Sequence, residues 1–253
     1  MGFVDIHSHV LYGLDDGAKT PEESVAMLQL AAAAGTTDIV ATPHANGQYA
    51  FNPALIDQRI TELTDRAPIR IHRGCDFHLQ FDNIQDALAH PDKYTVNHKS
   101  YLLVEFPDLS IFANTERILS QLLDRGMIPI ITHPERNDKL QRRIDDLAQW
   151  VDIGCYVQVT AGSCTGRFGK PAKQCADALM ERGLVHFIAS DAHDCKRRPP
   201  SLSSAYEALA GQWGEDAIQP LFVDHPRAVL TGDTIDFAFE PPAPRRKKWY
   251  QFW

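Results

Sequence analysis

Short apolar, β-branched runs alternate with longer segments of helical periodicity along the whole chain, and this alternation restricts the fold more than any other feature. The short runs predict seven strands, over residues 4–9, 38–44, 69–77, 101–106, 128–133, 156–160 and 186–191. Strands joined through helices run parallel, because the helix carries the chain back to the same edge of the sheet. The sequence therefore predicts an α/β fold.

Local signals support helices between these strands. Thr20-Pro21 precedes the helical run 24–34, and Asn52-Pro53 precedes the run 54–66; both pairs are typical helix starts. Glycines stand where a helix C-terminal cap is expected, at Gly35, Gly126 and Gly183. Six or seven strand–helix units in series favour a distorted (β/α)7-type barrel, and an open doubly wound sheet is the structural alternative.

The length of 253 residues allows one large domain or two small ones. No composition break appears before residue 240, so we expect a single domain over residues 1–240. Residues 241–253 form a separate tail, because prolines, four basic residues and then aromatic residues follow one another there. This tail either rests on its own domain or in solvent, or it contacts a membrane surface or a partner.

Composition argues against several classes of protein. A net charge of -8 does not suit binding to nucleic acid, which needs a basic surface. No apolar run approaches the roughly 18 to 20 residues of a membrane span, and no signal peptide pattern opens the chain. The five cysteines are odd in number and lack C-x-x-C spacing, so we expect reduced thiols and a cytoplasmic protein.

The strongest chemical signal is Asp5-Ile6-His7-Ser8-His9 at the end of the first predicted strand. Residues two apart in a strand point to the same side, so His7 and His9 present two imidazoles to one cation. The chain contains 11 His, and a lone one is most often structural. A His-x-His pair at a strand end instead favours a metal site.

Other predicted strands also end in a histidine or a carboxylate. In α/β barrels the C-terminal ends of the strands carry the active site, so these groups converge if the strands are parallel neighbours. Imidazole and carboxylate ligands without thiolates suit zinc, manganese or iron better than calcium. The residues concerned are His44, Glu105, His133, Asp191 and His193.

Further motifs occur in a fixed order along the chain: Asp5–His9, Asp15-Asp16-Gly17, Pro21-Glu22-Glu23-Ser24, His133-Pro134-Glu135-Arg136, Gly154–Val159, Ala189–His193, Arg198-Pro199-Pro200 and Asp224-His225-Pro226-Arg227. In this order they resemble the polymerase-and-histidinol-phosphatase (PHP) superfamily. More narrowly they resemble the metal-dependent bacterial protein-tyrosine phosphatases encoded with capsule and exopolysaccharide genes. The resemblance runs from about residue 3 to about residue 232.

The resemblance implies a distorted barrel that holds two or three divalent metal ions, most often manganese, with iron or zinc as alternatives. It implies three ligand sets: His7, His9 and Asp191; Glu105 and His133; Asp16, His44 and His193. It also implies one further carboxylate that bridges the metals. The bridge is usually a Glu in a Gly-x-Glu context, whereas Gly74-Cys75-Asp76 supplies Asp76, one methylene shorter. Asp15 is an alternative to Asp16, and His78 is a possible extra neighbour.

The chemistry that fits such a cluster is phosphate ester hydrolysis by a metal-bound hydroxide. Arg136 and Arg198 follow metal ligands closely and are expected to bind phosphate, with surface salt bridges as the alternative role. Cysteine-based phosphatases require C-x5-R, and none of the five Cys has Arg six positions later.

The cluster chemistry favours a metal-dependent phosphatase, and the resemblance implies a protein-tyrosine phosphatase that regulates capsule or exopolysaccharide biosynthesis. The resemblance alone implies its partner, a bacterial membrane tyrosine kinase carrying phosphotyrosine. Two alternatives stay open: a histidinol-phosphate-type phosphatase of the same superfamily, and a non-catalytic regulatory binding subunit whose shorter Asp76 leaves the cluster incomplete.

Overall fold

The computed structural model describes residues 2–235 of the chain. The expected tail, 241–253, lies outside the described residues, as do residues 236–240 of the expected domain. Nine strands are present within the described range: β1 (Phe3–Ser8), β2 (Thr36–Ala41), β3 (His44–Ala45), β4 (Arg70–Arg73), β5 (Asp76–His78), β6 (Tyr101–Glu105), β7 (Ile128–Thr132), β8 (Tyr156–Thr160) and β9 (Phe187–Ala189).

All paired strands are parallel, as the alternating pattern predicts. One sheet has the order β1-β2-β4 and the other the order β3-β5-β6-β7-β8-β9. Beyond β9, the amide of Asp191 donates to the carbonyl of His7, and the amide of His9 donates to the carbonyl of Ala192, both at 2.8 Å. These bonds join the last strand to the first, which is consistent with the predicted (β/α)7-type barrel.

The prediction of one continuous strand over 38–44 and another over 69–77 is wrong, because each region forms two shorter strands. The first breaks at Thr42-Pro43, where proline has no amide hydrogen to donate to a ladder. The second breaks at Gly74-Cys75. A Cβ at Gly74 would lie 2.7 Å from Val40 Cγ1, so the chain approaches its neighbour too closely there for any larger residue. These two breaks divide the barrel wall into two sheets.

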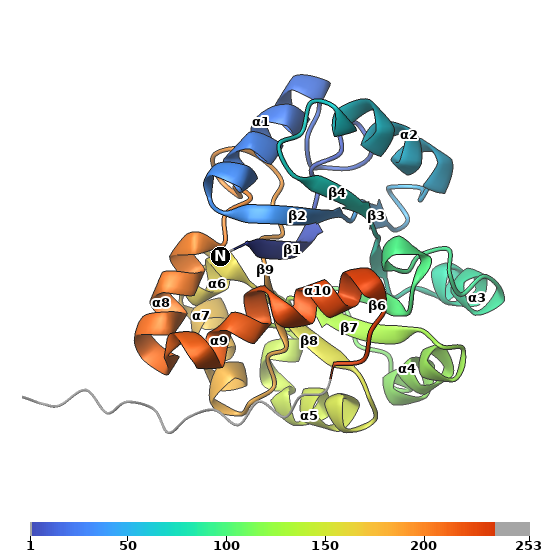
Figure 1. Ribbon diagram of the computed structural model, residues 1–253. Helices are drawn as coiled ribbons and strands as arrows, with labels where there is room; N and C mark the ends of the chain where they lie inside the picture. The colour runs from blue at the N-terminus through green and yellow to red at the C-terminus, as the bar shows by residue number, and fades with distance from the viewer. Residues whose placement is uncertain (1, 236–253) are drawn as a thin grey trace, which may run out of the picture.

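The helices lie outside the strands, with α1 and α2 beside β2 and β4, and α4 and α5 outside β6 to β8 (Figure 1). Short 3-10 turns occupy Val96–His98, Pro134–Arg136 and Leu140–Arg142. The α-helices are α1 (Pro21–Ala33), α2 (Pro53–Thr64), α3 (Phe81–Ala89), α4 (Thr115–Asp124), α5 (Ile144–Asp152), α6 (Ala161–Cys164), α7 (Gly169–Glu181), α8 (Ser203–Trp213), α9 (Glu215–Phe222) and α10 (Asp224–Thr231).

The predicted helix starts are confirmed at both positions. The side chain of Thr20 accepts a hydrogen bond from the amide of Glu23, and that of Asn52 accepts from the amide of Leu55. Gly35, Gly126 and Gly183 all have positive φ after helices, as C-terminal caps do.

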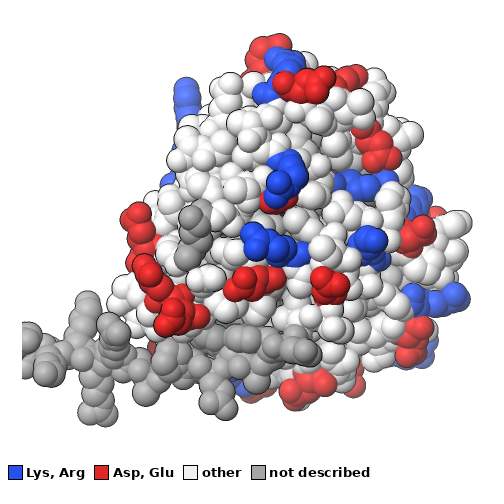
Figure 2. Space-filling model, viewed as in Figure 1, with Lys and Arg blue, Asp and Glu red and all other residues white. Residues whose placement is uncertain are grey.

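No helix among residues 2–235 is long and apolar enough to cross a bilayer. On the face drawn in Figure 2, Lys and Arg side chains are interspersed with Asp and Glu side chains. Charge on this face is therefore mixed rather than concentrated in one region.

Candidate active site

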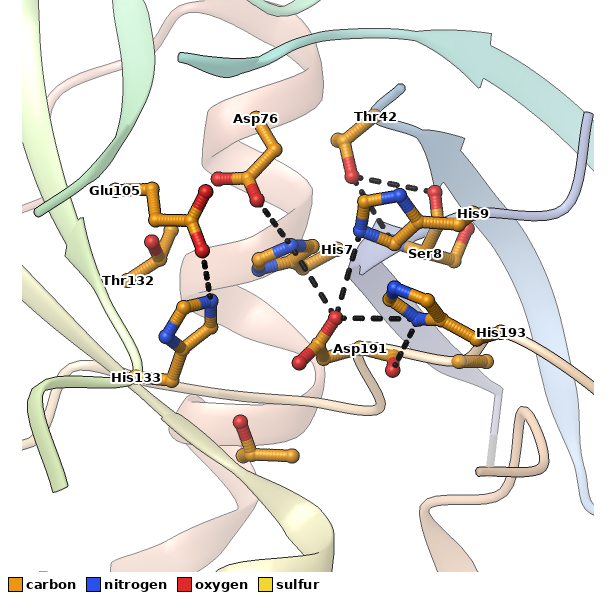
Figure 3. A network of polar contacts seen from close by, with 12 residues as sticks. His7, Ser8, His9, Thr42, Asp76, Glu105, Thr132, His133, Asp191 and His193 are labelled. Atoms are coloured by element: carbon orange, nitrogen blue, oxygen red, sulfur yellow. Dashed lines mark hydrogen bonds and ion pairs between the residues drawn. The ribbon is translucent and has the colours of Figure 1, made fainter. Parts of the chain in front are cut away.

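All nine residues that the sequence nominates as metal ligands gather near the C-terminal ends of the strands. Figure 3 shows seven of them: His7, His9, Asp76, Glu105, His133, Asp191 and His193. Their ligand atoms fall into four groups, within each of which the atoms lie within 4.8 Å of one another. The groups share members, so they form one continuous cluster. They are His7, His9 and Asp76; His7, His133 and Asp191; His44, Asp76 and Glu105; and His9, Asp16, His44 and His193.

His7 and His9 occupy the end of β1, and their side chains are buried within the barrel. Their Nε2 atoms lie 3.6 Å and 3.5 Å from the same Asp191 oxygen, Oδ1. Neither Nε2 has a hydrogen-bond partner. Two unpaired imidazole nitrogens therefore face one carboxylate, as the His-x-His pattern predicts.

The loop after β1 brings a carboxylate to two further histidines. Oδ1 of Asp16 lies 3.3 Å from Nε2 of His44 and 3.3 Å from Nε2 of His193. A Cβ at Gly17 would lie 2.1 Å from the backbone oxygen of His9, so only glycine allows this loop to pack against the strand end. Asp16, His44 and His193 thus form one side of the cluster, as the resemblance implies.

Asp76 is fully buried in the middle of the cluster. Strand pairing places it in register with His44, whose Nδ1 lies 3.1 Å from Asp76 Oδ2. The same oxygen lies 3.5 Å from Nε2 of His7, and neither Asp76 oxygen has a hydrogen-bond partner. The shorter carboxylate therefore still reaches two histidines that belong to different expected ligand sets.

Glu105 completes this side of the cluster. Its carboxylate lies 3.4 Å from Nδ1 of His44 and 3.8 Å from Nε2 of His133. His78, the possible extra neighbour, lies 3.2 Å from Glu105 through its Nδ1. Its Nδ1 is thus engaged by a carboxylate of the cluster, and His78 is not among the grouped ligands.

Two of the nine residues have an unusual backbone. His133 follows β7 with φ of 32°, and Asp191 follows β9 with φ of 50°. Side chains other than glycine rarely adopt this left-handed region, and such strain concentrates at functional sites. The backbone turns sharply at both strand ends and directs these two side chains into the cluster.

The pKa values of the cluster reflect its buried, opposed charges. Burial opposes protonation of His9, but the charge and hydrogen bond of Asp15, together with Asp191, outweigh it and raise the His9 pKa to about 9. His44 is partly buried, which opposes its protonation, but the nearby carboxylates of Asp16, Asp76 and Glu105 raise its pKa. By contrast, burial lowers the pKa of His133 to about 4.

This donor set fits divalent cations. Five imidazoles and four carboxylates meet there. Nε2 of His7 and His9, Nδ1 of His44 and both oxygens of Asp76 are buried without hydrogen-bond partners, and ligation would satisfy them. The negative carboxylates that favour protonation of His9 and His44 would equally favour a divalent cation bound in the cluster. Binding of that cation would displace the protons from the two imidazoles. Imidazole with carboxylate suits manganese, iron and zinc.

Arg136 and Arg198 lie at the edge of the cluster, and both donate to Oδ2 of Asp191. Their guanidinium carbons lie 4.4 Å and 5.9 Å from the centre of the Phe168 ring. The two arginines therefore converge on one point beside the ligands, rather than pairing with separate carboxylates on the surface.

Two residues that orient the proposed ligands, Gln158 and Asp15, were not assigned this role from the sequence. Nδ1 of His7 donates to Oε1 of Gln158 at 2.9 Å, and Nδ1 of His9 pairs with Oδ2 of Asp15 at 2.7 Å. Asp15 also accepts from the amides of Gly17 and His44, so it supports the site without joining the grouped ligands. The position of Gln158, a polar residue in the middle of the predicted strand 156–160, was the available signal for that residue.

Comparison with known proteins identifies relatives along almost the whole chain. A family model described as "Capsular polysaccharide synthesis, CpsB/CapC" matches residues 3–231. The tyrosine-protein phosphatase YwqE of Bacillus subtilis is 32% identical, over 98% of this chain and 99% of its own length. A solved structure described as YwqE from Bacillus subtilis and CpsB from Streptococcus pneumoniae, unique metal-dependent tyrosine phosphatases, superposes with a TM-score of 0.83.

That solved structure is 31% identical, and the match covers 95% of this chain and 98% of the other. The phosphotriesterase homology protein of Escherichia coli, with phosphate in its active site, has a TM-score of 0.57 at 10% identity. That match covers 89% of this chain and 97% of the other, and it supports the fold alone. The family resemblance drawn from the motifs is confirmed: the chain belongs to the CpsB/CapC capsular polysaccharide synthesis family.

Proposed function

We propose that this chain is a metal-dependent protein-tyrosine phosphatase whose active site is the cluster at the strand ends. One observation carries the proposal: buried ligand atoms without partners, on His7, His9 and Asp76, meet beside two converging guanidinium groups. The named activity of the relatives above supports the same conclusion.

The nine clustered residues would hold two or three divalent metal ions, with manganese as the expected metal and iron or zinc as alternatives. When bound, such ions lower the pKa of water and balance the charge of the attacked phosphate. The His7 and His9 rings are held through Nδ1, so each keeps Nε2 directed into the cluster.

Arg136 and Arg198 bind the phosphate in this proposal. Each guanidinium has five N–H donors, and the contact with Asp191 uses only part of them. The forked donors match phosphate oxygens and stabilise the charge that develops during transfer. Asp191 holds both arginines on one side of the cluster while its other oxygen faces His7 and His9.

The leaving group explains why no proton donor is required of the chain. A tyrosine phenol has a pKa near 10, so phenolate departs more easily than the alkoxide of an aliphatic alcohol. We infer that the substrate is phosphotyrosine on a protein of capsule or exopolysaccharide synthesis, with a bacterial membrane tyrosine kinase as the expected partner. The cytoplasm is the expected location.

The test is turnover of a phosphotyrosyl peptide after metal stripping and reloading with Mn²⁺, Fe²⁺ or Zn²⁺, with histidinol phosphate assayed in parallel. We expect stripping to abolish peptide turnover, Mn²⁺ to restore it and His7→Ala to prevent restoration. His90→Ala, a histidine exposed at the end of α3, serves as the control. Metal-dependent turnover that survives in His7→Ala would contradict the proposed site, and preference for histidinol phosphate would contradict the substrate.

A further inference from the structure

We propose that the cavity beside Asp16 and His193 is a subsite for acidic side chains that flank the phosphotyrosine of the substrate. The proposal rests on the proposed function and adds a specificity to it. The cavity has a volume of about 550 Å³ and lies between the loop after β1, the first turns of α1 and the loop after β9.

The position of the cavity links it to the phosphatase site. Asp16 and His193 line it, and both belong to the ligand cluster, with 3.3 Å between Asp16 Oδ1 and His193 Nε2. A peptide whose phosphate lies in the cluster therefore has this cavity beside it. The phosphate group alone is too small to fill both the ligand cluster and the cavity, so the cavity is available to neighbouring residues of the peptide.

Three cations line the cavity: Lys19, Lys196 and Arg197. All three are exposed, and within residues 2–235 no carboxylate forms an ion pair with any of their side chains. Among the described residues, the ammonium group of Lys19 donates only to the backbone oxygen of Asp15, at 3.1 Å. These positive charges are thus available to a ligand.

The carboxylates on the same wall are occupied by backbone amides. Oδ1 of Asp194 accepts from the amides of Lys196 and Arg197, each at 2.6 Å. Oε2 of Glu23 accepts from the amide of Lys19 at 2.6 Å. The acidic groups therefore stabilise the loops that display the cations, rather than neutralising the cations themselves.

The remaining lining is apolar, with Ala18 and Met27 buried at the cavity wall. Apolar walls with cations at the opening suit Asp or Glu side chains, which carry a methylene stem and a terminal charge. Exposed ion pairs are individually weak, so we expect the three cations of the cavity together to change kcat/KM by about five- to tenfold rather than by orders of magnitude.

The experiment compares two phosphotyrosyl peptides that differ only in flanking residues, Glu in one and Gln in the other. The manganese-loaded wild type is expected to prefer the Glu peptide about five- to tenfold in kcat/KM, and added salt should reduce this preference. The double variant Lys196→Ala/Arg197→Ala should lose most of the preference. The double variant Lys196→Glu/Arg197→Glu should reverse it in favour of a peptide flanked by Lys.

Arg117→Ala/Arg125→Ala, which removes two exposed charges at α4, is the matched control and should keep the wild-type preference. Equal rates of the wild type on both peptides, or equal loss of preference in the control, would overturn the subsite alone. If the loaded wild type turned over neither peptide, the proposed function would fail and the subsite with it.

Discussion

Nδ1 of His7 donates a hydrogen bond of 2.9 Å to Oε1 of Gln158, and both side chains are fully buried. A glutamine oxygen only accepts, so this bond places the ring proton on Nδ1 and leaves the lone pair of Nε2 directed into the cluster. Gln158 comes from β8, which is separated from β1 in the barrel wall only by β9. A residue distant in sequence thus fixes the tautomer of a proposed ligand.

Replacing Gln158 with Leu should therefore weaken metal binding without removing a ligand. Changes to groups that orient ligands typically cost 10- to 100-fold in metal affinity or activity, and we expect about tenfold for Gln158→Leu. Metal titration of the stripped protein measures this loss. Gln121→Leu, an exposed position on α4, is the control, and equal affinities in the two variants would contradict the role of Gln158.

Asp76→Asn tests the central carboxylate while keeping its size. Both Asp76 oxygens are buried without partners, and Oδ2 lies near His7 and His44. An amide supplies a neutral oxygen in place of an anion, so we expect fewer bound metal ions and a fall in kcat of more than about 100-fold, beyond the usual effect of an orienting residue. Metal analysis and phosphotyrosyl-peptide kinetics measure both; wild-type metal content in Asp76→Asn would contradict a bridging role.

Much of the architecture follows from patterns that are local in sequence. Strand periodicity, the starts at Thr20 and Asn52 and the glycine caps all depend on interactions within a few residues. The break in the predicted strand 38–44 also has a local cause, Pro43. The break in 69–77 does not, because Gly74 is needed only once Val40 packs against it from another strand. Local patterns therefore predict the elements, but they miss an irregularity that depends on packing against a neighbouring strand.

The candidate site divides in the same way. Apart from Asp16, which lies in the loop after β1 and was expected only from the family resemblance, the proposed ligand residues lie at or within two residues of predicted strand ends. Parallel strands bring such ends together, so their convergence was predictable. The partners of those ligands were not, because contacts such as His7 with Gln158 depend on register across the barrel. Asp15 and Asp16 are adjacent, and only the loop held by Gly17 directs Asp15 to His9 and Asp16 to His44.

Arg198→Lys tests phosphate binding at the edge of the cluster. Lysine keeps the charge but loses the planar fork that reaches Asp191 and the Phe168 ring together. We expect kcat/KM for the phosphotyrosyl peptide to fall about 100-fold, as for loss of a donor to a transition-state anion. Inhibition by inorganic phosphate should weaken as well. Arg125→Lys is the control, and unchanged phosphate inhibition in Arg198→Lys would contradict phosphate contact.

His186 gives the fold a dependence on pH that is separate from the metal cluster. Burial and the neighbouring His225 lower its pKa to about 4, and its Nδ1 accepts a hydrogen bond from the amide of Val157 at 3.1 Å. The unfolded chain binds this proton near its ordinary pKa of about 6.5, whereas the folded chain resists it. Stability from this group is therefore complete above about pH 6.5 and is lost as the pH falls towards 4.

Between about pH 7.5 and pH 5 the loss should be about 2 kcal/mol in the free energy of unfolding. His186→Asn keeps an acceptor near the Val157 amide but does not titrate, so its free energy of unfolding should fall less over the same interval. Urea unfolding of both metal-free proteins at the two pH values measures these falls in the free energy of unfolding. The other titrating groups are the same in both proteins, so their contribution cancels when the two falls are compared. Equal falls in the wild type and in His186→Asn would show that His186 does not titrate with a lowered pKa.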